Sequence, residues 1–96
     1  MSALDDVLRH RHELRRIAVE FGARNPRLFG SAVRREDRPD SDIDILIDID
    51  PDDGFRRCIA IADAFERVLG RPVDLVTERG LNPRLKPNVL AEAIPL

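Results

Sequence analysis

Apolar residues recur every three or four positions in three stretches of this chain, which is the spacing of helices with one buried face. The pattern predicts helices over about residues 3–22, 55–69 and 83–93, and Gly70 stands where the middle one would be capped at its C-terminus. A further short helix is expected to open at Ser31, directly after a glycine. Helices therefore account for most of the predicted structure.

Three shorter stretches have the pattern of β-strands. Residues 27–30 form an apolar run behind an Asn-Pro break, and residues 42–48 alternate between aspartate or leucine and isoleucine. Residues 72–77 form a third apolar run interrupted by one aspartate. The elements follow in the order α-β-α-β-α-β-α, which predicts an α/β fold. A chain of 96 residues has room for one such domain, residues 1–96.

The charge of the chain is nearly balanced but unevenly distributed. Sixteen basic and eighteen acidic residues give a net charge of −2, with +3 over the first 39 residues and −5 over the rest. This balance, four Phe and the lack of Trp and Tyr argue against a nucleic-acid-binding domain. One cysteine, Cys58, excludes an internal disulfide. With no signal peptide or membrane-spanning run expected, we predict a soluble, cytoplasmic protein.

Three aspartates on predicted strands are the candidate metal ligands. Asp42 and Asp44 are two residues apart, so both side chains leave the same face of one strand about 7 Å apart along the backbone. Asp74 joins them if its strand lies alongside. Without a cation such carboxylates repel, and at least one is expected to keep its proton at neutral pH. Two Mg²⁺ ions about 4 Å apart would neutralise this cluster and supply the clamp used in nucleotidyl transfer.

A candidate phosphate site precedes the aspartates. Gly30 and Ser31 stand where a strand is expected to end and a helix to begin, a position where free N–H groups bind phosphate. The Ser31 hydroxyl could donate to a phosphate oxygen, and Arg34 is expected on the same helical face. A phosphate site and a cation site so close in sequence suit a metal-bound triphosphate.

Together these residues resemble the DNA polymerase beta nucleotidyltransferase superfamily. Gly30-Ser31, then Ser41-Asp42-Ile43-Asp44 at the head of a strand, then Asp74 in "VDLVT" look like a minimal nucleotidyltransferase, or MNT domain, nearly end to end. With the three predicted strands, the resemblance implies a three-stranded mixed sheet with the second strand central, packed with about four helices. It assigns nucleotide binding to Gly30 and Ser31, and metal binding and catalysis to Asp42, Asp44 and Asp74. Arg34 and Ser41 complete the residues that we expect to bind nucleotide.

The resemblance also implies an activity and a partner. MNT domains resemble antitoxins that transfer AMP from ATP to a toxin carrying a HEPN ribonuclease domain, with which this chain would form a hetero-oligomer. The chain has no Tyr, so a tyrosine acceptor would belong to the partner. The alternative is a non-catalytic module that neutralises a partner by covering it. Three converging carboxylates favour the enzyme, because mere binding does not require them.

Overall fold

The computed structural model describes residues 2–52 and 54–96. Its elements, in chain order, are α1 (Ala3–Arg9), α2 (Arg11–Glu20), β1 (Ala23–Phe29), the single 3₁₀ turn η1 (Gly30–Ala32), β2 (Ile43–Ile49), α3 (Gly54–Leu69), β3 (Val73–Thr77), α4 (Lys86–Glu92) and β4 (Ile94–Pro95). The predicted α/β class and the predicted positions of β2, α3 and β3 are confirmed.

The strands form one mixed sheet in the order β3-β2-β1-β4. β2 lies between β3, to which it is parallel, and β1, to which it is antiparallel. The prediction of three strands is wrong, because the two residues of β4 pair with Arg27 and Leu28 at the outer edge of β1. A strand of two residues is too short to show the alternation by which strands are recognised in a sequence.

Several predicted elements have different bounds in the structure. The helix expected over residues 83–93 is shorter, Lys86–Glu92. The helix expected over residues 3–22 is divided at His10, whose ring nitrogen lies 2.9 Å from the Asp6 carbonyl oxygen. β1 begins earlier than expected and includes Pro26. It does so because its register with β2 shifts between Arg24 and Arg27, where Asn25 has a positive φ of 53°.

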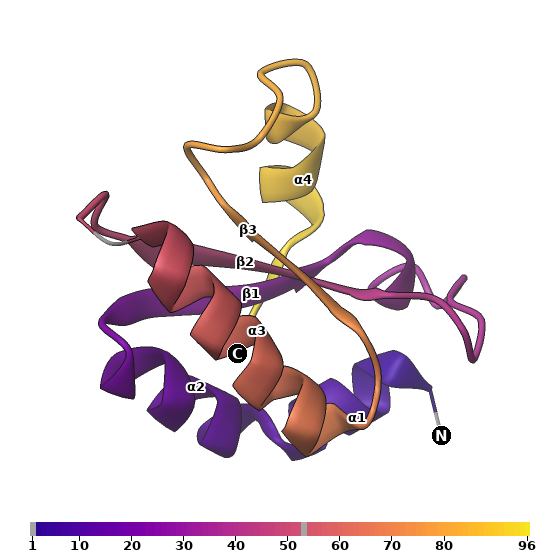
Figure 1. Cartoon of the computed structure of the whole chain (residues 1–96). Coiled ribbons are helices and arrows are strands. Elements are labelled where there is room, and N and C mark those ends of the chain that lie inside the picture. Colours follow the sequence, from indigo (N-terminus) through magenta and orange to yellow (C-terminus); the bar gives the residue numbers. More distant parts are fainter. Residues whose placement is uncertain (1, 53) are drawn as a thin grey trace.

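The helices cover the two faces of the sheet unequally. In Figure 1, α1, α2 and α3 pack beneath the sheet and the short α4 lies on the opposite side. Ile43, Ile45 and Ile47 of β2 are fully buried in the core cluster formed with α1–α3. Leu46 belongs to a smaller cluster with Phe29 and Val89 of α4. Asp44 therefore lies on the α4 side, which α4 covers only in part.

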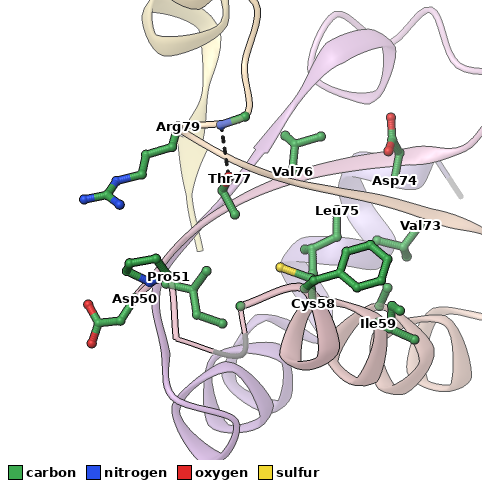
Figure 2. A pocket seen from close by; sticks show the side chains of 15 residues that line it. Asp50, Pro51, Cys58, Ile59, Val73, Asp74, Leu75, Val76, Thr77 and Arg79 are labelled. Carbon is green, nitrogen blue, oxygen red and sulfur yellow. Dashed lines mark hydrogen bonds between the residues drawn. The ribbon is translucent and has the colours of Figure 1, made fainter.

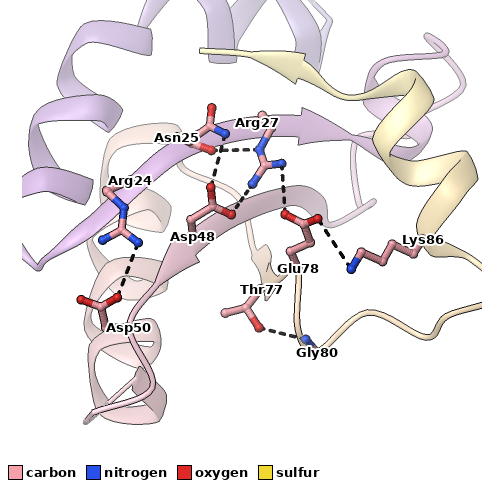
Figure 3. A network of polar contacts seen from close by, with 9 residues as sticks. All are labelled: Arg24, Asn25, Arg27, Asp48, Asp50, Thr77, Glu78, Gly80 and Lys86. Carbon is pink, nitrogen blue, oxygen red and sulfur yellow. Dashed lines mark hydrogen bonds and ion pairs between the residues drawn. The ribbon is translucent and has the colours of Figure 1, made fainter.

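A polar network fixes the segment between β3 and α4 against the sheet (Figure 3). Arg27, only 9% exposed, pairs with Asp48 at 2.7 Å and with Glu78 at 4.0 Å. Lys86, the first residue of α4, pairs with the same Glu78 at 3.6 Å. These contacts tie the start of α4 to β1 and β2.

No helix in the described part of the chain is both long and apolar enough to cross a membrane.

Phe65 tests the core, with Phe55 of the same helix as a matched control. Phe65 is fully buried and Phe55 is 81% exposed. Phe65→Ala leaves a cavity and is expected to lower the free energy of unfolding by about 3–5 kcal/mol. Phe55→Ala should change it by less than about 0.5 kcal/mol. Urea denaturation measures both, and equal effects would contradict this packing of α3.

Candidate active site

The pairing of β2 with β3 brings the predicted carboxylates to one place. Asp44 and Asp74 are register partners on these adjacent parallel strands. Asp42 lies two residues before Asp44, just ahead of the first residue of β2. The condition set by the sequence, that the strand of Asp74 be a neighbour of β2, is met.

The electrostatics of Asp44 show how close these charges are. Burial, followed by the negative charges of Asp74 and Asp42, raises the pKa of Asp44 to about 6, against the opposing effect of Arg34. Repulsion thus acts in the expected direction. A pKa of about 6 lies well above the ordinary value of 3.8 for aspartate. That at least one of the three carboxylates keeps its proton at neutral pH stays a prediction.

The carboxylates do not by themselves form a metal cage. Within residues 2–52 and 54–96, no three His, Cys, Asp or Glu side chains are grouped so that they could hold a metal ion. Asp42 and Asp74 are exposed and Asp44 is half-buried. The site offers oxygen donors on one surface, where other ligands would have to complete the coordination of a hard cation.

Gly30 packs directly against Asp44. Phe29 is the register partner of Asp44, and Gly30 follows with a φ of 81°, in the left-handed region that favours glycine. A Cβ built at Gly30 would lie 3.0 Å from Cγ of Asp44 and closer still to its Oδ2. The fold thus brings the predicted phosphate loop into contact with the predicted metal site.

The loop itself is shorter than predicted. The helix expected at Ser31 is a single 3₁₀ turn, so Arg34 lies just beyond it, in the turn that follows. Arg34 is nevertheless joined to Gly30 through the carboxylate of Glu92. The phosphate contacts of Ser31 and Arg34 stay predictions.

Glu92, near the end of α4, is a site residue that the sequence did not indicate. One carboxylate oxygen of Glu92 accepts the Gly30 N–H at 2.9 Å. Nη1 of Arg34 donates to both Glu92 oxygens, at 2.8 and 3.1 Å. Arg34 Nε also donates to Glu36 at 3.2 Å, and these two carboxylates raise the pKa of the Arg34 guanidinium. Glu92 lies 62 residues from Gly30, so no local sequence signal identifies it.

Arg71 is a second residue missed by the sequence. Its Nη2 donates to the carbonyl oxygens of Arg38, at 2.8 Å, and Ser41, at 2.7 Å, and its Nη1 pairs with Asp37 at 3.4 Å. Arg71 comes just before β3 and Ser41 just before Asp42. A single guanidinium thus joins the two backbone segments that lead to the aspartates.

Ser41 has a structural contact of its own. Its hydroxyl oxygen accepts the backbone N–H of Arg38 at 2.9 Å, which closes the turn ahead of Asp42. The predicted contact of Ser41 with nucleotide stays a prediction.

A hollow of about 640 Å³ lies between α3 and β3 (Figure 2). Cys58 and Ile59 of α3 line it together with residues of β3. In Figure 2, Val73 and Leu75 point toward α3, whereas the Asp74 carboxylate points to the opposite side of β3. Asp74 is thus among the residues that line the hollow, but its carboxylate points away from α3.

Asp44 gives the first testable consequence of this geometry. Its pKa is raised from 3.8 to about 6, so the folded state binds the proton more tightly than the unfolded chain. The resulting stabilisation is complete below pH 3.8 and is lost as pH rises through about 6.

Asp44→Asn removes the titrating group. The Tm of the variant minus the Tm of the wild type should therefore increase as the pH rises from 4 to 7. At pH 7, MgCl₂ should raise the Tm of the wild type more than that of Asp44→Asn, because a bound cation stabilises the folded state. Thermal melts in metal-free and MgCl₂ buffers measure this. Asp40→Asn, in the preceding turn, is the control, and the same pH trend in both variants would contradict the assignment.

Arg71 gives a second testable consequence of this geometry. Arg71→Met removes the donors that hold the carbonyls of Arg38 and Ser41, so amide hydrogen exchange over residues 37–42 should accelerate by about 10-fold or more. Arg67→Met is the control, since Arg67 is exposed and its ion pair, with Asp63, lies within α3. Mass spectrometry of exchanged peptides distinguishes the two, and unchanged exchange in Arg71→Met would show that Arg71 does not hold this turn.

Comparisons with known proteins agree on one family. The sequence pattern of the family described as "Polymerase beta, Nucleotidyltransferase" matches residues 24–96. The protein adenylyltransferase MntA of Thermococcus cleftensis is 38% identical over 85 residues, which are 88% of this chain and 83% of that protein.

Two solved structures share the fold. One, described as a minimal nucleotidyltransferase, has a TM-score of 0.86 and 40% identity, covering 100% of this chain and 97% of the other. Another, of a toxin–antitoxin with AMP-PNP, has a TM-score of 0.69 at 23% identity and covers 91% of this chain and 69% of the other. The second likeness concerns the fold alone. Since the family pattern spans both the phosphate loop and all three aspartates, the chain belongs to the polymerase beta nucleotidyltransferase family, as a minimal nucleotidyltransferase domain.

Proposed function

We propose that this chain transfers AMP from ATP to a hydroxyl, a tyrosine of a HEPN-domain toxin, and thereby acts as an antitoxin. The observation that carries the proposal is the contact of Gly30 with Asp44, because it brings the loop that we propose to bind phosphate against the paired aspartates. A nucleotidyltransferase needs both, because it must hold a triphosphate and stabilise the charge that develops when the α-phosphate is attacked.

The residues of the site divide into two groups. Gly30, Ser31, Arg34 and Ser41 would contact the phosphates, whereas Asp42, Asp44 and Asp74 would hold two Mg²⁺ ions. Mg²⁺ is usually bound by one or two carboxylates together with phosphate oxygens and water, so it does not require a cage made by protein alone. This fits three carboxylates on one side of the sheet, of which Asp44 has its pKa raised by burial and then by the charges of Asp74 and Asp42. When bound, the ions would neutralise phosphate charge.

The proposed acceptor is a second protein. A relative 38% identical to this chain is named a protein adenylyltransferase, and a structural neighbour is described as a toxin–antitoxin with AMP-PNP. The chain itself has no Tyr, and α4 covers the carboxylate side of the sheet only in part. A docked protein would cover the rest, exclude water and position the acceptor hydroxyl. Its HEPN character, the tyrosine and a cytoplasmic location stay predictions.

Asp42→Asn tests the proposal. Loss of one carboxylate charge should lower AMP transfer by about 100-fold or more, because charge stabilisation in the transition state is lost. The variant should remain folded, since Asp42 is exposed. Purified protein is incubated with α-labelled ATP, Mg²⁺ and a lysate of the source organism, and the labelled protein and residue are identified by mass spectrometry.

Asp40→Asn is the matched control, since it removes an aspartate two residues away in the same turn. Labelling that is equal with wild type and Asp42→Asn would contradict the role of Asp42. A partner that co-purifies with the wild type and stays unlabelled in the presence of ATP and Mg²⁺ would favour the non-catalytic module instead.

A further inference from the structure

The Glu92 carboxylate accepts hydrogen bonds from two groups that we propose to bind the nucleotide, the Gly30 N–H and the Arg34 guanidinium. Both of its oxygens accept from Arg34. We propose that Glu92 is an internal competitor of the ATP phosphates, so that ATP gains Gly30 and Arg34 only when the Glu92 carboxylate leaves them. This inference rests on the proposed function and names a residue that regulates access to its phosphate site.

The backbone around Glu92 determines where the carboxylate lies. The chain turns into an extended conformation at Ala93, and Ile94 pairs with Leu28 of β1, one residue before the Phe29-Gly30 step. At the other end of α4, Lys86 is paired with Glu78. Because both ends of α4 are anchored, the position of Glu92 beside Gly30 follows from the pairing of β4 with β1.

The carboxylate can leave without disrupting this anchoring. The Glu92 side chain is 24% exposed, so its head group borders solvent while its backbone stays in α4. A rotation of the side chain would transfer its charge to water and free the Gly30 N–H. The competition therefore requires a change of side-chain conformation and no unfolding of α4.

Charge explains why carboxylate and phosphate exclude each other. Both are anions that need the same N–H and guanidinium donors, and the surroundings already contain Asp44, Asp42 and Asp74. A triphosphate entering beside Glu92 would add to this repulsion. If Glu92 occupies the donors in most molecules, only the remaining fraction is ready to bind ATP. The apparent ATP affinity is then the intrinsic affinity multiplied by this fraction.

Glu92→Gln provides the test, because it removes the charge and keeps the size of the side chain. Isothermal titration with ATP and Mg²⁺ should show binding tighter than wild type by about 10-fold, the scale of a lost charge-assisted contact. Tripolyphosphate should gain affinity in the same way, whereas adenosine, which has no phosphate, should not.

Glu36→Gln is the matched control. Glu36 also pairs with Arg34, at Nε, whereas it is Glu92 that accepts the Gly30 N–H. Its replacement should change ATP affinity by less than about 3-fold. If Glu36→Gln tightens binding as much as Glu92→Gln, general loss of negative charge is the cause and the proposal is overturned.

Further outcomes separate the competitor from a residue that merely positions Arg34. In an Arg34→Ala background the gain from Glu92→Gln should shrink, because the two side chains are coupled. Weaker or unchanged ATP binding in a folded Glu92→Gln would overturn the proposal. If that variant does not fold, Glu92→Asp, which keeps the charge but shortens its reach, should still tighten binding. Absence of ATP binding in every variant, wild type included, would instead contradict the proposed function.

Discussion

The site depends on one steric constraint, the contact between the backbone of Gly30 and the carboxylate of Asp44. Antiparallel pairing of β1 with β2 places Phe29 opposite Asp44, and the next residue then has no room for a side chain. A shift of this register by one residue would turn Asp44 into the core and bring Ile43 or Ile45 to the loop. The same pairing that buries the isoleucines thus fixes the proposed phosphate loop against Asp44, a proposed metal ligand.

This arrangement concentrates negative charge, and the rest of the fold compensates for it. Asp44 is half-buried beside Asp42, Asp74 and Glu92, with Arg34 as the opposing charge. The opposite face of β2 is wholly aliphatic and buried under α1–α3. Further along the sheet, Arg27 joins Asp48 and Glu78, and Arg71 holds the turn before Asp42. The buried aliphatic face and these arginine contacts stabilise the fold. The site can therefore contain repelling carboxylates that suit a substrate.

Whether a feature could be predicted from the sequence depends on how far apart in the chain the residues that determine it lie. The aspartates at 42 and 44 stand out because strand periodicity is local, and Gly70, with a φ of 68°, has the expected helix-ending conformation. The pairing of Asp44 with Asp74 needed the family resemblance, since local pattern does not order strands. β4, Glu92 and Arg71 were missed because each acts on residues about 30 to 60 positions away in the chain. The break at His10 was missed because apolar spacing continues across it.

Glu92 also resolves a difficulty that a preformed phosphate loop creates. A buried backbone N–H beside the half-buried Asp44 costs free energy if it has no acceptor, and without Glu92 the Arg34 guanidinium would keep only its contact with Glu36 among the described residues. With Glu92 bound, both donors are satisfied before any nucleotide arrives, so the loop stays ordered in the conformation that the ligand needs. Order is then obtained at the expense of apparent affinity, because the nucleotide must displace the carboxylate that kept the loop in place. A loop without Glu92 would bind phosphate without competition but would have to be ordered by the ligand itself.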